Sequence, residues 1–559
     1  GHPLVPPSAQ TAADDIKKEK LNSLPQDDAN PGRQTTSLMT HPVPTSVFDC
    51  ASFHQELLVA ACLGDVVELK RLIATGADFN RLENDWSPLS IAASHGKASV
   101  VAALSLLPNL QNVNDVIPYS GDSRYLGGIA PISAALADQG NWVPEYFSRT
   151  DVDPNASNKN GETALHKAVN YSWVLYPDSP EGLQQKAAFD AVIAGLLSLA
   201  KINVNATDQY GTTPLMLAAT YDRRNNLLSR LLSHPKIDVN MIGQRGWSAL
   251  TYASLVGLGY IVNHSNLRSL LADPRIDVNL RNQKGNTTLM LEAENSDQAL
   301  DTEGLELLLS DQRVDINAQN LEGQTAAMLG WSNCKDHYRG KRIPLYLKRK
   351  DLNLNLQDNS GQTAAMYAIH EDWGCNAAEK FVENFSQVVS RPDFNVNLKD
   401  SNGNPILIHL LAANDFVLYN RLQLAQAVLS RKDLDPNTIA NVRNEPKGTT
   451  ALMLAIGGAI WSGNSYMDET AITEISKLIV EHPAFSHLNS ENERGKTALI
   501  LNSGNSTQKF RQGTIKLLLS LPGIDVNHRD RSGKTALGYA LEYHFDDTAQ
   551  ALRDAGGVQ

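Results

Sequence analysis

A single globular core would be unusually large for a chain of 559 residues, whereas an array of repeats has no such limit because each repeat contacts only its neighbours. The formal net charge of −12 argues against general nucleic-acid binding, since neutralising phosphates requires a basic face. The longest apolar run, Ala451 to Trp461, is about half of the roughly 20 residues that a membrane span needs, so we expect no transmembrane segment.

Residues 1–46 are polar and rich in proline, and they begin with Gly1-His2, which looks like a remnant of cloning. This composition cannot bury a core, so we predict a flexible segment followed by a continuous array over residues 47–559. Whether the segment targets the protein or binds a partner stays open. The array begins with a helix pair from about Phe53 to Thr75.

One motif recurs along the array, and a clear copy covers residues 202–219. Each copy has an extended piece around Asp-Val-Asn, a glycine that closes a turn, and a Thr-(Pro/Ala)-Leu segment that opens an apolar helix. Gly211 stands where a tight turn needs a positive φ, Thr213 is a candidate N-cap, and Pro214 suits a first helical turn. The apolar run 227–232 predicts a second helix. Two short helices cannot bury these faces alone, so each unit must stack on its neighbours.

This motif resembles the ankyrin repeat, a turn plus two helices around Thr-Pro-Leu-His with a period of about 33 residues. The segment 57–80 follows the family pattern closely. The resemblance implies a mainly α solenoid with short β-hairpin fingers, and the repeat openings count to about 13 units. The family's histidine is kept only at His166. Elsewhere methionine takes its place, which we expect to replace hydrogen bonds by core packing, at Met216, Met290, Met328, Met366 and Met453.

Uneven spacing of the anchor glycines indicates inserted loops, at residues 108–127, 171–185, 331–342, 438–447 and 457–470. Loops on a rigid scaffold commonly carry binding residues, and large aromatic side chains are favoured interface anchors. The protein-binding candidates are therefore Trp142, Trp173, Tyr176, Trp331, Tyr338, Arg339, Trp373, Trp461 and Tyr466. The alternative is that each tryptophan packs at the base of its own loop.

Searching for catalysis gives no P-loop, dinucleotide fingerprint, His-Glu-x-x-His, nucleophile elbow or kinase motif. We therefore predict a scaffold that is not an enzyme and needs no cofactor or metal. It would bind one or more proteins as a monomer through its concave face, its fingers or its Trp-bearing loops. Pairs that precede the anchor glycines, such as Gln209-Tyr210 and Leu321-Glu322, are expected at the finger tips. The divergent repeats are similar to those of protists and of bacteria that live inside them, which suggests a secreted effector acting in host cytosol.

The four cysteines, Cys50, Cys62, Cys334 and Cys375, are too few and too scattered for a disulfide framework, which favours a reducing compartment and the cytoplasm. One alternative function is an enzyme that combines Cys334 and Cys375 with His337 and His370. Cys334-x-x-His337 alone supplies only half of a structural zinc site. The other alternative is an attachment module that uses the basic loop 335–350.

Overall fold

The structure, a computed structural model, describes residues 49–117, 131–171, 180–221, 226–255, 264–294, 302–332, 339–370, 379–412, 421–443, 445–457, 469–504 and 512–559. Its described residues form 26 α-helices, α3 to α28, and one 3-10 helix, η1. Two helices per repeat give thirteen repeats, as the sequence predicts. None of the helices in these ranges is long and apolar enough to cross a membrane.

The chain divides into two compact units. The first contains residues 1–209, 234–236 and 256–263, and the second contains residues 210–233, 237–255 and 264–559. The helices of the first unit are η1 (Cys50–Ser52), α3 (Glu56–Leu63), α4 (Val66–Ala74), α5 (Pro88–Ser94), α6 (Ala98–Ser105), α7 (Ile132–Asp138), α8 (Pro144–Phe147), α9 (Ala164–Tyr171) and α10 (Pro180–Ser198).

The helices of the second unit continue the same alternation of first and second helices. They are α11 (Pro214–Tyr221), α12 (Asn226–Leu232), α13 (Ala249–Leu255), α14 (Ser265–Ala272), α15 (Thr288–Glu294), α16 (Glu303–Ser310), α17 (Ala326–Ser332), α18 (Arg339–Leu347), α19 (Ala364–His370), α20 (Glu379–Ser390), α21 (Ile406–Ala412), α22 (Arg421–Leu429), α23 (Ala451–Gly457), α24 (Glu469–Val480), α25 (Ala498–Ser503), α26 (Gln512–Ser520), α27 (Ala536–Glu542) and α28 (Asp546–Asp554).

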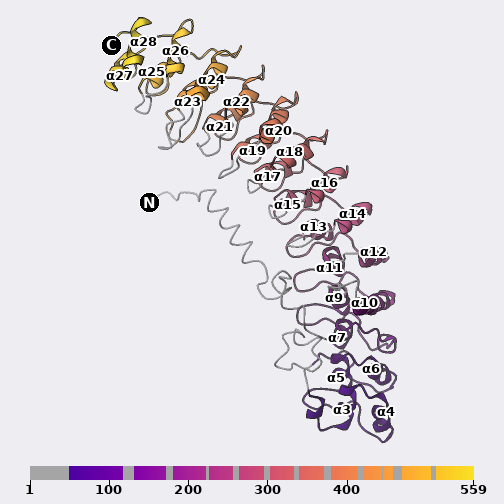
Figure 1. Cartoon of the computed structure of the whole chain (residues 1–559). Coiled ribbons are helices and arrows are strands. Elements are labelled where there is room, and N and C mark those ends of the chain that lie inside the picture. Colours follow the sequence, from indigo (N-terminus) through magenta and orange to yellow (C-terminus); the bar gives the residue numbers. More distant parts are fainter. Residues whose placement is uncertain are drawn as a thin grey trace. The chain divides into compact units, whose positions relative to one another are not determined.

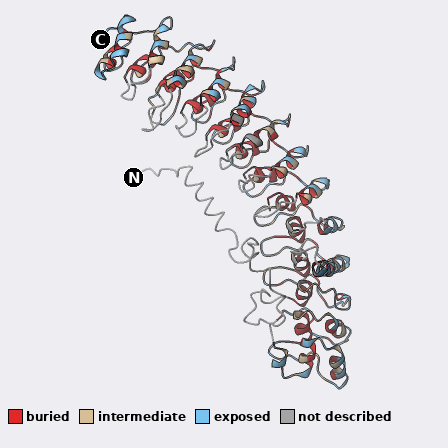
Figure 2. Ribbon diagram, in the orientation of Figure 1, coloured by how far each residue is buried: buried red, intermediate tan, exposed pale blue. Residues whose placement is uncertain are grey.

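Within each unit the first helices of successive repeats pack side by side in one row, and the second helices pack in another (Figure 1). The first helices are buried almost all round, as in α21, where residues 406–411 are all buried. The second helices bury only one stripe, which in α24 contains Ile472, Ile475 and Ile479 (Figure 2). Successive members of this stripe are three or four residues apart, which places them on one helix face.

The predicted start of each first helix is confirmed in the copy at residues 202–219. Gly211 has a φ of +72°, and α11 begins at Pro214. The hydroxyl oxygen of Thr213 accepts a hydrogen bond from the Met216 N–H at 3.2 Å, which caps the helix. The local sequence therefore sets this boundary.

The five methionines at the histidine position are core residues, each at most 1% exposed. The expected loss of the family's hydrogen bonds between repeats stays a prediction, but within the repeat two of the methionines accept a local hydrogen bond that the sequence did not lead us to expect. The sulfur atoms of Met216 and Met328 accept from the N–H of Thr213 and Thr325 at 3.4 and 3.3 Å. His166 Nδ1 accepts from the Thr163 N–H at 3.2 Å in the same way. A thioether sulfur is a weak acceptor, and here it lies close enough to do this.

The expected β-hairpin fingers are turns without strands in the described parts of the chain. Only isolated β-bridges occur there, such as Ser157 with Thr163 and Lys399 with Pro405. The turn closes over too few residues to form a ladder of pairs. Two predicted insertions are also shorter than expected, because α10 already begins at Pro180 and α18 at Arg339.

Candidate protein-binding surface

In the part of the chain that the structure describes, most repeats project a finger turn, which we define as the segment from three residues before the anchor glycine to two after it. In the turn 320–325, Asn320 Oδ1 accepts from the N–H of Glu322 at 3.0 Å and of Gln324 at 2.8 Å. The Gly323 N–H donates to the Asn320 carbonyl at 2.9 Å. An Asn or Asp side chain can mimic backbone turns in this way. The same pair of side-chain bonds closes the turns that begin at Asn158, Asn282, Asp358, Asp400, Asn492 and Asp530.

Neighbouring finger turns are joined by backbone hydrogen bonds. In the second unit Leu321 N–H donates to the Lys284 carbonyl at 3.0 Å, and Asn359 N–H donates to the Glu322 carbonyl at 2.9 Å. Ser401 N–H continues the series to the Ser360 carbonyl at 2.8 Å. Each acceptor immediately precedes an anchor glycine. The backbone of one turn therefore positions the backbone of the next.

The asparagine that ends the Asp-Val-Asn motif bridges successive repeats at the base of the fingers. Asn317 Nδ2 donates to the Asp351 carbonyl at 2.7 Å, and its Oδ1 accepts from the Asn353 N–H at 2.8 Å. An amide side chain can do both because it carries a donor and an acceptor. The donating bond recurs in the first unit at Asn80, Asn114, Asn155 and Asn205, and in the second at Asn240, Asn279, Asn355, Asn397, Asn437, Asn489 and Asn527.

Sequence reasoning did not assign a role to these asparagines. The signal was present, because nine of the twelve bridging asparagines stand six residues before their anchor glycine, as Asn317 does before Gly323. A residue kept for solubility alone would not need to be an amide each time.

Exposed apolar side chains lie on the finger turns of the second unit or between the bridging asparagine and the turn. Tyr210 is 48% exposed, Leu321 72%, Ile242 42% and Ile439 53%. Trp247 is half-buried beside its turn, where its ring packs edge-on against Tyr252 at 5.4 Å. The expectation that the pairs before the anchor glycines are exposed is confirmed at Tyr210 and Leu321. Aromatic and aliphatic groups held in this way can enter a partner's pocket at little entropic cost.

Residues 185–282 match the family model of ankyrin repeats (3 copies). The protein contains ankyrin repeats. Beyond the matched residues the same helix pairs and asparagine bridges continue to the last repeat, α27 and α28. No curated protein matched the chain. Ankyrin repeats generally mediate protein–protein interaction.

Two of the candidate tryptophans pack within the helix-pair array. Trp331 is only 1% exposed and lies edge-on against Tyr346 of α18, with ring centroids 6.1 Å apart. We therefore withdraw it as a surface anchor. Trp142 is half-buried, stacks on Phe147 at 4.9 Å and covers Gly195 of α10, where a Cβ would fall 2.3 Å from the indole. For these two the alternative interpretation, packing beside the loop, fits better.

The other loop candidates fall outside the part of the chain that the structure describes. They are Trp173, Tyr176, Tyr338, Trp373, Trp461 and Tyr466. Arg339 begins α18, but its side chain is not among those described. The same holds for the cysteine–histidine alternative: Cys334, His337 and Cys375 are outside, and His370 is described only as the last residue of α19.

Two arginines of the predicted basic loop have buried guanidinium groups that bond to the preceding repeat. Arg342 is buried and donates to the Ala293 carbonyl at 3.0 Å. Arg349 is also buried, donates to three backbone carbonyls of the preceding repeat and pairs with Asp351 at 2.7 Å. Lys348 and Lys350 remain exposed. The two arginines therefore hold repeats together and are not available to an acidic ligand.

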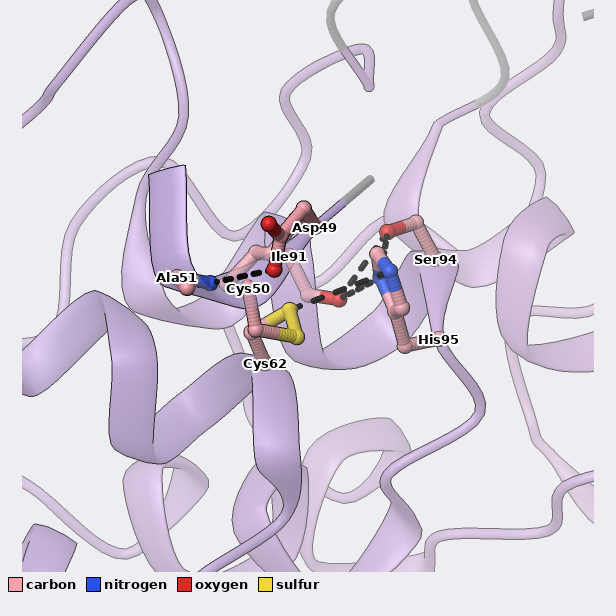
Figure 3. The surroundings of a disulfide bond; sticks show 7 residues. All are labelled: Asp49, Cys50, Ala51, Cys62, Ile91, Ser94 and His95. Atoms are coloured by element: carbon pink, nitrogen blue, oxygen red, sulfur yellow. Dashed lines mark hydrogen bonds between the residues drawn. A yellow bond between two sulfur atoms is a disulfide. The ribbon is translucent and has the colours of Figure 1, made fainter. Parts of the chain in front are cut away.

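One disulfide, which the sequence did not lead us to expect, joins Cys50 and Cys62 in the first repeat. Helix η1 turns the chain back over α3 and brings their Cα atoms to 5.7 Å, within the range for a disulfide. His95 lies beside the bond, with its Nε2 3.8 Å from Cys62 Sγ (Figure 3). Burial lowers the pKa of the His95 imidazole below its usual value, against an opposing effect of the hydrogen bond to Ile91.

Proposed function

We propose that the protein is a non-catalytic scaffold that binds a protein partner along the finger turns of its second unit. The observation that carries the proposal is the contrast within each turn. The backbone is hydrogen-bonded to itself and to the next turn, while the tip side chains, such as Leu321 at 72% exposure, are left in solvent. Because the backbone is already ordered, less conformational entropy is lost on binding. A few apolar side chains can therefore give sufficient affinity.

The test compares two leucines with the same exposed fraction. Leu321 lies on a finger turn and Leu106 lies at the end of α6, and both are 72% exposed. A photo-crosslinking residue placed at position 321 should attach the partner, and the same residue at position 106 should not. Equal crosslinking at both positions, or at position 106 alone, would move the interface away from the fingers.

Leu321→Ser combined with Tyr210→Ser should then weaken the captured complex at least tenfold, while Leu106→Ser leaves it unchanged. Both side chains are exposed, so the folded state should survive, and far-UV circular dichroism checks this. A variant with Trp173, Trp373 and Trp461 changed to alanine tests the loop surface in parallel. Loss of binding in that variant alone would transfer the site to the loops.

The enzyme alternative predicts a reactive thiol. Labelling of Cys334 and Cys375 no faster than a free thiol would remove it. We also keep as a prediction that the protein is a bacterial effector in host cytosol, which a translocation reporter fused to the chain would test. The attachment alternative predicts steep salt dependence of binding, whereas anchoring by Tyr210 and Leu321 predicts little.

A further inference from the structure

The first repeat brings together three groups that can bind a metal. Cys50 Sγ, Cys62 Sγ and a ring nitrogen of His95 all lie within 4.8 Å of one another. Cys62 is buried on α3, while Cys50 and His95 are half-buried. Figure 3 shows the imidazole facing the two sulfur atoms. The cluster therefore has a closed side in the core and an open side towards solvent.

Hydrogen bonds set the tautomer of His95. Its Nδ1 lies 3.0 Å from the Ile91 carbonyl oxygen, which can only accept. Nδ1 also lies 3.0 Å from the Ser94 hydroxyl, whose own proton goes to the same carbonyl at 2.9 Å. Nδ1 therefore carries the proton, and Nε2 presents its lone pair towards Cys62. Metal-binding histidines typically donate the other ring N–H to a carbonyl in this way.

One ligand pair already has the spacing of a tetrahedral zinc ion, and the two sulfur atoms, which are bonded to each other in the disulfide, must separate to about 3.8 Å on reduction. Zn–S bonds of about 2.3 Å and Zn–N bonds of about 2.0 Å place a sulfur and a nitrogen ligand about 3.6 Å apart. Cys62 Sγ and His95 Nε2 are already 3.8 Å apart. Two thiolates and a neutral imidazole would give a Zn²⁺ complex with no net charge, which suits a half-buried position.

We propose that Cys50, Cys62 and His95 form a redox-controlled zinc site, closed as a disulfide when oxidised and able to bind Zn²⁺ when reduced. A dithiol reductant supplies two electrons and two protons to the disulfide, is itself oxidised to a disulfide, and leaves two thiols. Zn²⁺ then forms two Zn–S bonds and one Zn–N bond, and the two thiol protons pass to solvent. Three protein ligands leave the fourth position to water. Both the disulfide and the zinc complex link η1 to α3, so the N-terminal end of the first repeat stays attached in either state.

The experiment uses the full chain with Cys334→Ser and Cys375→Ser, so that only Cys50 and Cys62 remain as thiols. This background is reduced with a dithiol, freed of reductant under argon and titrated with Co²⁺ as a spectroscopic probe. One equivalent should produce a thiolate-to-cobalt charge-transfer band, and Zn²⁺ should remove it. The oxidised background should give no band.

Two variants on this background locate the ligands. Cys50→Ser should abolish the band, and His95→Ala should weaken Co²⁺ binding by more than the 10- to 100-fold that loss of an outer-shell partner costs. Cys50 is half-buried, so its variant keeps the fold even where one at the buried Cys62 does not, and far-UV circular dichroism checks both. No band in the reduced background, or an undiminished band in Cys50→Ser or His95→Ala, would overturn the proposal.

Discussion

The two ends of a repeat junction are held by different chemistry. At the base of the fingers the bridge is an asparagine at every position where the structure describes it. Near the ends of the second helices the donor to the preceding repeat is most often an arginine, at Arg149, Arg275, Arg313, Arg349, Arg391 and Arg431, but other residue types also occur. Arg349 donates to three carbonyls there, Lys236 donates to the Ala200 carbonyl, and His482 Nε2 pairs with the Arg431 carbonyl.

The difference follows from what each position must supply. The finger bridge needs a donor and an acceptor on one short side chain, and only an amide of that length offers both. The helix-end position needs only a donor, and an arginine, a lysine or a histidine ring N–H can supply it to carbonyls near the end of the preceding repeat's second helix. On the finger side the bridging residue type is therefore constant and the tip side chains point into solvent. On the helix-end side the basic side chains are used in hydrogen bonds between repeats.

Replacing an anchor glycine should lower the free energy of unfolding more than any other change on the finger side. Gly361 and Gly403 lie in adjacent turns with φ values of +75° and +85°. A Cβ at Gly361 would fall 2.8 Å from Ser401 N, whereas nothing lies within 4 Å of a Cβ at Gly403. Gly403→Ala should cost the positive-φ strain alone, about 1 to 2 kcal/mol. Gly361→Ala should cost about 1 to 3 kcal/mol more, because the next turn must move.

Urea unfolding followed by circular dichroism measures both glycine variants, and amide exchange shows whether the change is confined to the turns. Equal losses would mean that neighbouring turns do not constrain each other. The finger side of the junction would then be held by the asparagine bridge alone.

Removing one bridge should have a smaller effect. Asn317→Ala loses the bonds to the Asp351 carbonyl and from the Asn353 N–H, worth about 1 to 3 kcal/mol together. Asn317→Asp should be as costly, since a carboxylate cannot donate to that carbonyl. The control is Asn353→Ala, which removes only a local bond to the Asn355 N–H. A stable Asn317→Asp variant would show that the acceptor half is sufficient.

Replacing the cation at the helix end should cost less than removing the amide, if the donor there is exchangeable. Arg349→Lys keeps the charge but cannot fork towards the carbonyls of Leu309, Asp311 and Val314. We expect a loss of about 1 kcal/mol in urea unfolding. The exposed Lys350, in the same segment, gives the control Lys350→Ala, which should change the midpoint little. A loss larger than that of Asn317→Ala would reverse the ranking of the two sides.

Much of the fold could be predicted because each repeat contains local sequence signals for where its turn and its first helix begin. The Thr213-Pro214 start and the glycine at Gly211 each have one local physical cause, and both positions were identified correctly. The candidate site was predicted less well. Burial of Trp331 depends on Tyr346 of the next helix, and the disulfide depends on η1 folding back over α3. Such contacts arise from packing between elements, which residue spacing does not encode.

The finger turns also differ among themselves, since some are closed by asparagine and others by aspartate, and at Asp530 the carboxylate makes the stability of the turn depend on pH. Burial alone would raise the pKa of Asp530, but hydrogen bonds from Ser532, Tyr539 and the Lys534 N–H outweigh it and hold the pKa at about 2. A pKa below the ordinary 3.8 means that the carboxylate stabilises the fold above about pH 4. That contribution disappears as the pH falls towards 2.

Asp530→Asn keeps the acceptor for both turn N–H groups, as in the asparagine turns, and loses only the charge-assisted bond from Tyr539. The variant should be less stable than the parent by on the order of 1 kcal/mol at pH 7 and equally stable near pH 2. Urea midpoints at pH 7, 4 and 2 measure this convergence. A difference that stays constant with pH would assign the loss to turn geometry, and the aspartate and asparagine turns would then be equivalent in what they contribute.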